Sequence, residues 1–434
     1  MRKVSDFVAR ASTQQIAISL YALAALIRLA IAVLRGLNTT PPIGDEWGYY
    51  VLANRMIEGL GYTRLWPDGI LRPAGTQMPG TSLFIAIGLL IFGKHPYSAY
   101  LMAVLISSAS VPLMYLFARR FASHHIAIAA ASACMLYPTW AFYSTSSLSE
   151  PFFIPLLLLA LLLTSIAFKS TEWRTALWAG MAWGAAALVR PHGVPMAILV
   201  SAYLLWRKGW RESALVALGC ALVVGPWVIR NQRMFGSPVL ATESGETLLG
   251  SNNPYVLKNP KLHGMWLSTW EIPEYRRMIE FNFDELERSR IQNKVGWAYL
   301  RQNPGVIPRL TVYKVRRWLT PITVSGGAVR LMVLISYGPL LLFLGIGLFR
   351  KVYRRSIELD LISMWSLIML GITIVYWGNL TRGRLPLEMV WIPWATIGAA
   401  DLFSRFRVRV VDRLPADSFV TSFARYLVRL CTMW

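Results

Sequence analysis

Two adjacent carboxylates open the part of the chain where residue types suggest catalysis. Asp45 and Glu46 stand just after the first long apolar segment, and Trp47, Tyr49 and Tyr50 follow them. A carboxylate at a bilayer surface, beside aromatic groups, is partly desolvated, which raises its pKa toward the range in which a general base works. We therefore predict Asp45 as a base that deprotonates an acceptor hydroxyl, with Glu46 as its partner. The alternative is a solvated, helix-capping pair.

Three arginines are candidates for holding an anion. Arg190 ends a short apolar segment, where an ionised group is costly unless it faces protein, water or an anion. Arg382 and Arg384 flank Gly383 in a predicted loop before the last apolar segment, with Pro386 opening the next helix. Guanidinium groups bind phosphate bidentately, so we favour a phosphate for all three. A structural carboxylate, or lipid head groups reached by snorkelling, are the alternatives for Arg190.

Further polar residues accompany these candidates. Glu150 follows a polar run and precedes Pro151, so it is either an auxiliary carboxylate that binds the acceptor or a helix cap favoured by the macrodipole. His192 is predicted as a hydrogen-bonded loop residue, because no second histidine or carboxylate stands at ligand spacing. Neither a metal nor a nucleotide cofactor is expected, since no glycine-rich phosphate loop is present.

The elements that must position these residues are membrane helices. The chain has 434 residues, 55% of them hydrophobic and only 15% charged, which is typical of an integral membrane protein. The net charge of +22 falls largely in short clusters between apolar runs, so it indicates topology and not nucleic-acid binding. Ten spans are predicted: 16–34, 97–118, 126–143, 152–168, 176–189, 194–206, 214–229, 331–349, 361–377 and 387–403.

The positive-inside rule sets the predicted topology. Residues 82–92 are too short for a safe span and are interpreted as an interfacial helix, which leaves both termini in the cytoplasm. A membrane domain of residues 1–403 then has two long extracytoplasmic loops, 36–96 and 231–330, and the second is expected to form a partly helical lid. Residues 404–434 form a basic cytoplasmic tail with an amphipathic helix. The predicted location is the inner or plasma membrane.

An ordered series of short motifs resembles a known class of enzymes. The motifs are GDEWGYY at 44–50, GLGY at 59–62, MPG at 78–80, SEP at 149–151, RPHG at 190–193, PWVIRN at 226–231, GSNNP at 250–254 and RGRLP at 382–386. In this order they resemble the polyprenyl-phosphate-sugar glycosyltransferases of the GT-C class, which include the protein O-mannosyltransferases and the aminoarabinose lipid A transferase. Gly383 departs from the pattern, where an aromatic residue is more usual.

The resemblance implies an all-α membrane fold and an inverting transfer of a hexose or pentose from a polyprenyl-phosphate donor to an acceptor hydroxyl. It implies that Asp45 is the base and that Arg190, Arg382 and Arg384 hold the lipid phosphate. Tyr49, Tyr50, His192, Asn252 and Asn253 would position donor or acceptor. The acceptor stays open between lipid A, another glycolipid, a cell-wall polysaccharide and a protein. A transporter or flippase for lipid-linked sugars is the alternative function, and a non-catalytic membrane scaffold is a third.

Overall fold

The computed structural model describes residues 12–37, 42–282, 284–321, 326–376 and 381–409. Helices dominate this part of the chain, and two three-residue strands are its only sheet, which confirms the predicted all-α class. The apolar helices identify a multi-pass membrane protein. The bundle consists of α2 (Thr13–Leu34), α4 (Pro79–Phe92), α5 (Pro96–Ser108), α6 (Ser110–Ala118), α7 (His124–Leu136), α8 (Pro138–Tyr143), α9 (Glu150–Lys169), α10 (Trp173–Val189), α11 (Gly193–Arg207), α12 (Trp210–Phe235), α18 (Gly327–Phe349), α19 (Ile357–Val375) and α20 (Thr381–Arg409).

Six segments among the described residues are long and apolar enough to cross a membrane: α2, α5 with α6, α9, α12, α18 and α19. The other four predicted spans correspond to shorter helices or to α20, so the number of ten crossings stays a prediction. The span predicted at 126–143 is not one helix. It divides into α7 and α8 because Tyr137 is extended and Pro138 begins the second helix, as proline lacks the N–H that a continuous helix needs.

Glycines bring two bundle helices into close contact. A β-carbon at Gly180 of α10 would lie 2.1 Å from the carbonyl oxygen of Val216 in α12, and one at Gly219 would lie 2.3 Å from that of Leu177. Small residues allow helix backbones to approach closely in a membrane, where packing replaces the hydrophobic effect as the driving force. The α10–α12 contact holds the turn that carries Arg190, because Arg190 follows α10 directly.

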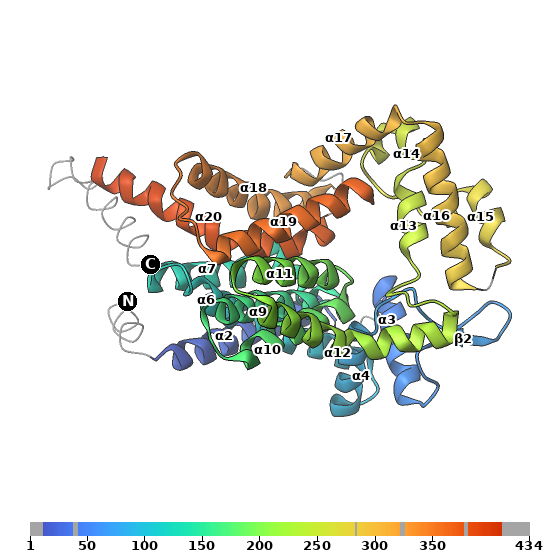
Figure 1. Ribbon diagram of the computed structural model, residues 1–434, viewed down its shortest axis with the longest axis horizontal. Coiled ribbons are helices and arrows are strands. Elements are labelled where there is room, and N and C mark those ends of the chain that lie inside the picture. The colour runs from blue at the N-terminus through green and yellow to red at the C-terminus, as the bar shows by residue number, and fades with distance from the viewer. Residues whose placement is uncertain (1–11, 38–41, 283, 322–325, 377–380, 410–434) are drawn as a thin grey trace.

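The long loops gather at one end of the bundle. The first contains α3 (Asp45–Ile57) and the antiparallel strands β1 (Thr63–Leu65) and β2 (Leu71–Pro73). The second contains α13 (Ser244–Ser251), α14 (Pro254–Lys258), η1 (Pro260–Leu262), η2 (Thr269–Glu271), α15 (Pro273–Ile279), α16 (Glu285–Gln302) and α17 (Val306–Leu319), which we call the lid. Both lie at the right of Figure 1, whereas α2 begins and α20 ends at the left.

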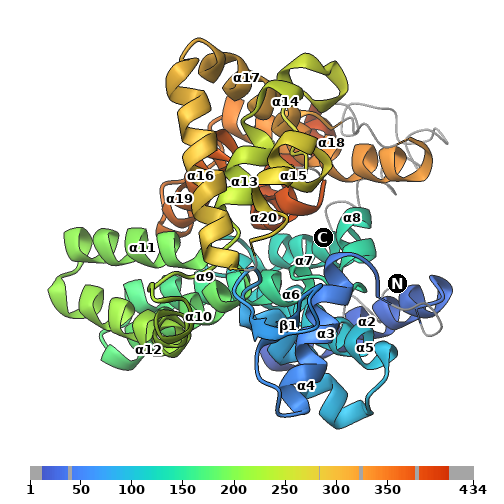
Figure 2. The same ribbon diagram turned by 90° about the vertical axis from the view of Figure 1, so that its right-hand side faces the viewer.

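Two buried polar contacts attach the lid to the rest of the molecule. Glu285 at the start of α16 accepts hydrogen bonds from the backbone N–H groups of Gly75 and Thr76, at 2.7 and 2.9 Å, and from the Thr242 hydroxyl at 3.0 Å. Lys314 of α17 donates to Asn252 at 2.8 Å and to the last carbonyls of α19. The lid is therefore held against the first loop and against the bundle, as Figure 2 shows for α13 and α16 above α3.

The start of α20 differs from the prediction. Arg382, Gly383 and Arg384 were expected in a loop, with Pro386 opening the helix, but α20 begins at Thr381 and includes all four residues. Pro386 is the sixth residue of this helix and lies inside it, so the helix lacks the hydrogen bond that an N–H at this position would donate. The predicted amphipathic helix of the 404–434 tail lies outside the described residues beyond Arg409.

Candidate active site

Asp45 lies at the first turn of a short helix, at the end of the bundle that carries the long loops. Gly44 precedes it with φ +57°, a left-handed conformation that glycine adopts without steric cost. Asp45 and Glu46 occupy the helix N-terminus, where the macrodipole favours negative charge. The Asp45 side chain is 57% exposed, so a substrate can reach its carboxylate.

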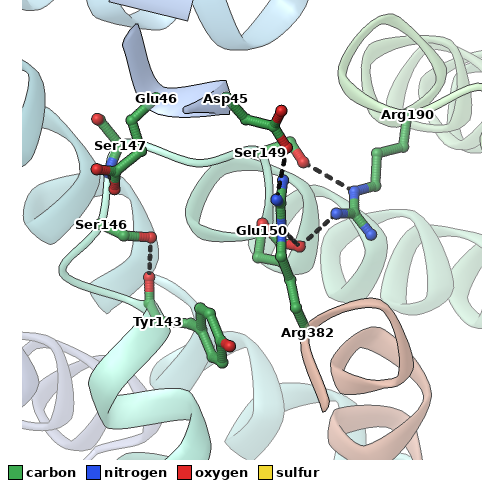
Figure 3. Close-up of polar contacts among 9 residues, drawn as sticks. All are labelled: Asp45, Glu46, Tyr143, Ser146, Ser147, Ser149, Glu150, Arg190 and Arg382. Carbon is green, nitrogen blue, oxygen red and sulfur yellow. Dashed lines mark hydrogen bonds and ion pairs between the residues drawn. The ribbon is translucent and has the colours of Figure 1, made fainter. Parts of the chain in front are cut away.

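Four charged side chains from four separate segments form one cluster (Figure 3). Arg382 donates to Asp45 from Nη1 at 2.7 Å and to Glu150 from Nε at 2.6 Å. Arg190 donates to the same Glu150 oxygen, and to the Ser149 hydroxyl at 2.9 Å. Glu150 is fully buried and therefore requires these cations. The structure thus brings together Asp45, Glu150, Arg190 and Arg382, all of them predicted site residues.

Both arginines keep N–H groups that these contacts do not use. A guanidinium carries five donors. Arg382 employs Nε and Nη1, and Arg190 employs Nε and Nη2. The remaining donors can bind an oxyanion such as a phosphate without breaking the contacts to Glu150. Glu150 is therefore the residue that orients the two cations.

Glu46 points away from this cluster, toward the loop before α9 (Figure 3). Its carboxylate accepts a hydrogen bond from the Ser147 backbone N–H at 3.0 Å and one from the Tyr100 hydroxyl at 3.5 Å. Burial raises the pKa of Glu46, although the Ser147 N–H and nearby Arg35 oppose the shift. The sequence suggested desolvation for Asp45, but it is the neighbouring Glu46 that is desolvated. The contacts of Glu46 hold α3 against the bundle.

Two further groups border the cluster. Tyr49 of α3 is buried, and burial raises its pKa to about 12, so the phenol stays neutral and able to donate. Glu243, just before α13, has a pKa raised to about 7 by burial and by the negative charges of Asp45 and Glu246. Its surface is exposed, although neighbouring protein desolvates the carboxyl.

Other predicted site residues lie apart from the cluster. Arg384 is buried and donates to Glu388 at 2.5 Å and to the carbonyls of Trp318 and Thr320. Asn252 accepts from Lys314, and Asn253 caps α14 by accepting from the Val256 N–H. These side chains hold secondary structure together and do not contact Asp45.

The remaining two predicted residues are near neighbours of the site. His192 is half-buried, and its buried Nδ1 has no partner among the described residues; its ring lies 6.2 Å from that of Phe153. Tyr50 stacks on Trp47 with ring centroids 5.9 Å apart. Their predicted roles in positioning substrates stay predictions.

Sequence reasoning missed Ser147, Ser149, Arg35 and Glu243 as members of the site. The polar run 144–149 was noted only as preceding Glu150. A serine in a loop does not by itself indicate that an arginine or a glutamate will bind it. Glu243 stands about 200 positions after Asp45 and gives no local motif. Their roles depend on tertiary contacts alone.

A hollow of about 420 Å³ lies beside Asp45. It is bordered by α3, β1 and the segment before α4, and the residues that matter for its chemistry are Asp45, Trp47, Arg55, Arg64 and Gln77. Within the described segments, no group of three His, Cys, Asp or Glu side chains gathers as a metal site.

Comparison with known proteins supports the class expected from the motifs. The family model described as dolichyl-phosphate-mannose-protein mannosyltransferase matches residues 73–229, from the end of β2 to within α12. No curated protein matches the chain in sequence. The match covers less than half of the chain and shows that these residues are similar to a family of mannosyltransferases.

Solved structures share the fold. The archaeal oligosaccharyltransferase AglB from Archaeoglobus fulgidus, in complex with an inhibitory peptide and a dolichol-phosphate, has a TM-score of 0.55 at 16% identity and covers 97% of this chain. Its apo form has a TM-score of 0.56 at 16% identity and covers 96% of this chain. This chain spans 54% of either AglB chain, about half its length.

ArnT from Cupriavidus metallidurans, bound to undecaprenyl phosphate, is a further similar structure. It has a TM-score of 0.42 at 14% identity, and the match covers 94% of this chain and 82% of that one. The resemblance to the GT-C glycosyltransferases, first seen in the ordered motifs, is confirmed by the family model together with the shared fold.

Proposed function

We propose that this chain, a membrane protein with the GT-C glycosyltransferase fold, transfers a sugar from a polyprenyl-phosphate donor to an acceptor hydroxyl. The observation that carries the proposal is the cluster in which an exposed carboxylate, Asp45, is joined through Arg382 to a buried Glu150 and a second cation, Arg190. One carboxylate and two cations at one place are what the transfer requires. The matching family is described by a lipid-phosphate sugar donor.

In the proposed reaction the acceptor oxygen attacks the anomeric carbon of the donor sugar as the carbon–oxygen bond to the lipid phosphate breaks. Asp45 takes the proton of the acceptor hydroxyl, and the free donors of Arg190 and Arg382 stabilise the phosphate that leaves. A single displacement inverts the anomeric configuration. Arg384 has no part in this step, since its guanidinium is occupied by Glu388 and two carbonyls.

The proposed location of the site is the extracytoplasmic face of the inner or plasma membrane. The basic clusters of the sequence support cytoplasmic termini, and the start of α2 and the end of α20 lie at the opposite end of the bundle from α3 (Figure 1). The lid and the first loop would then both be outside the cell. Labelling of single cysteines placed in the lid and after α2 by a membrane-impermeant reagent would test this sidedness.

The experiment that tests the function is sugar transfer from a panel of radiolabelled polyprenyl-phosphate sugars to a membrane extract, with purified wild type and Asp45→Asn. We expect transfer by the wild type from one donor, in the presence of excess chelator, and its loss in the variant while donor binding persists. Donor translocation in vesicles without transfer would favour the transporter instead. Activity untouched by the substitution would exclude Asp45 as the base.

A further inference from the structure

Arg382 does not line the hollow beside Asp45, which carries groups that the proposed reaction does not use. Its volume is about 420 Å³, within the range of small-molecule sites. If Asp45 is the base, the acceptor hydroxyl must reach it from an accessible space. The inference below therefore rests on the proposed function.

Two arginines at the far part of the hollow lack a carboxylate partner. Among the residues that the structure describes, no acidic group lies within ion-pair distance of Arg55 or Arg64; Arg55 donates only to the Thr63 carbonyl, at 2.9 Å. Glu58, the nearest acidic residue in sequence to Arg55, pairs with Lys94 at 3.5 Å. Two unneutralised cations at one hollow create a local positive potential that attracts an anion.

Two further arginines stand near Arg64, and carboxylates offset part of their charge: Asp68 pairs with Arg72 at 2.7 Å, and Arg64 opposes the rise that burial causes in the pKa of Glu243. Arg64 stands directly opposite Arg72 in the β1–β2 pair, where the repulsion between like charges is reduced but not removed by the Asp68 carboxylate on Arg72. Arg288 of the lid is also close: Arg64 lowers the pKa of Arg288, although burial is the larger cause. An anion bound at Arg64 would relieve this repulsion.

The near part of the hollow offers groups suited to a sugar. Trp47 is 51% exposed, so its ring is a surface on which the apolar face of a sugar can pack. Gln77 also lines the hollow, and its buried Oε1 has no hydrogen-bond partner in the described chain. A buried acceptor without a partner is costly, and a sugar hydroxyl would satisfy it.

We propose that the hollow binds the acceptor and that this acceptor is a saccharide with an acidic group, which Arg55 and Arg64 bind. Asp45 and Arg55 are ten positions apart on α3, or ~15 Å along the helix axis. The acidic group therefore lies well away from the hydroxyl that reacts. This separation of the backbone positions favours an acceptor of more than one sugar unit.

The test measures binding of two matched probes, tetragalacturonic acid and its neutral methyl ester, to full-length protein in phosphatidylcholine nanodiscs at low salt. Titration calorimetry compares wild type with Arg64→Gln, Arg55→Gln and Arg290→Gln. Arg290 is an exposed arginine of α16 outside the hollow and serves as the control. Binding of the lipid phosphate that donor and product share is measured on the same samples with undecaprenyl phosphate.

We expect the wild type and Arg290→Gln to bind the acid at least tenfold more tightly than the ester, and both hollow variants to lose this preference while undecaprenyl phosphate binding is unchanged. Equal binding of the two probes by the wild type, or a preference that survives both substitutions, would overturn the proposal. A preference that disappears in phosphatidylglycerol nanodiscs would assign the hollow to lipid head groups and also overturn it. If the wild type does not bind undecaprenyl phosphate, the result would count against the proposed function instead.

Discussion

Asp45 at the start of α3 and Arg382 at the start of α20 form an ion pair of 2.7 Å across 337 positions of the chain. The contact orients the one exposed carboxylate of the cluster and links it to Glu150 and Arg190. Because Glu150 is buried and accepts from both arginines, it fixes the two cations beside Asp45 without itself touching the substrate.

Replacement of Asp45 by asparagine should reduce the rate of transfer without a matching loss of donor affinity. A general base contributes about 10²–10⁴-fold to a rate, and the amide cannot accept the proton. Single-turnover transfer and donor binding, measured separately, check this expectation. Glu287→Gln, which alters an exposed carboxylate of α16, is the control and should transfer at the wild-type rate. A variant that loses donor affinity as strongly as rate would place Asp45 in donor binding.

The two arginines of the RGR motif should behave differently when changed. Arg382→Gln removes a cation from the cluster and should weaken donor binding by roughly 10–100-fold, since a hydrogen bond to a charged group contributes about 1.5–3 kcal/mol. Arg384→Gln instead leaves Glu388 buried without its cation, which should lower stability by about 3–5 kcal/mol. Donor titration and thermal unfolding in detergent separate the two effects. Equal donor affinities for both variants would contradict the assignment.

The contact of Glu285 with the first loop should control how firmly the lid is held. Glu285→Ala leaves the Gly75 and Thr76 N–H groups without their acceptor, a loss of about 1–3 kcal/mol for a buried hydrogen-bonding group. We expect faster proteolysis of the lid between Glu243 and Pro260 in this variant. Glu287→Ala, two positions along the same helix and exposed, should be cleaved at the wild-type rate. Identical cleavage of both variants would show that other contacts hold the lid.

The sequence predicted the positions of several helices and part of the charge cluster, from different signals. Hydropathy located α2, α9 and α12 because a membrane span needs a long apolar run. The motifs also predicted that Asp45, Glu150, Arg190 and Arg382 belong together. Arg384 was misplaced because it was assigned to a loop: two residues apart on a helix, Arg382 and Arg384 are rotated by ~200° and point to opposite sides.

Contacts of the lid could not be predicted in the same way. Glu285 reaches a loop 210 positions earlier, and Lys314 reaches Asn252 and the end of α19. The sequence shows only an acidic residue at a helix start and a lysine within a helix, both of which are usually solvated. Burial of these residues follows from the packing of the lid on the bundle, which no local pattern encodes.

Glu243 should give the protein a pH-dependent stability near neutrality. Its pKa is raised from 4.5 to about 7 by burial and then by Asp45, so the folded protein binds this proton more tightly than the unfolded chain does. The contribution of this carboxyl to the free energy of unfolding is therefore fully present below about pH 4.5, and it is lost as the pH rises toward about 7. Glu243→Gln keeps the shape of the side chain but cannot ionise, so it escapes this loss.

Thermal unfolding of wild type and Glu243→Gln between pH 5 and 8.5 checks this expectation. The difference in Tm should be small at pH 5, grow in favour of the variant through pH 7 and then level off, because the negative charge near Asp45 is complete above that pH. Glu271→Gln, which changes an exposed carboxylate of the same lid, should follow the wild type at every pH. A constant difference between Glu243→Gln and wild type across the range would mean that the Glu243 carboxyl does not titrate there.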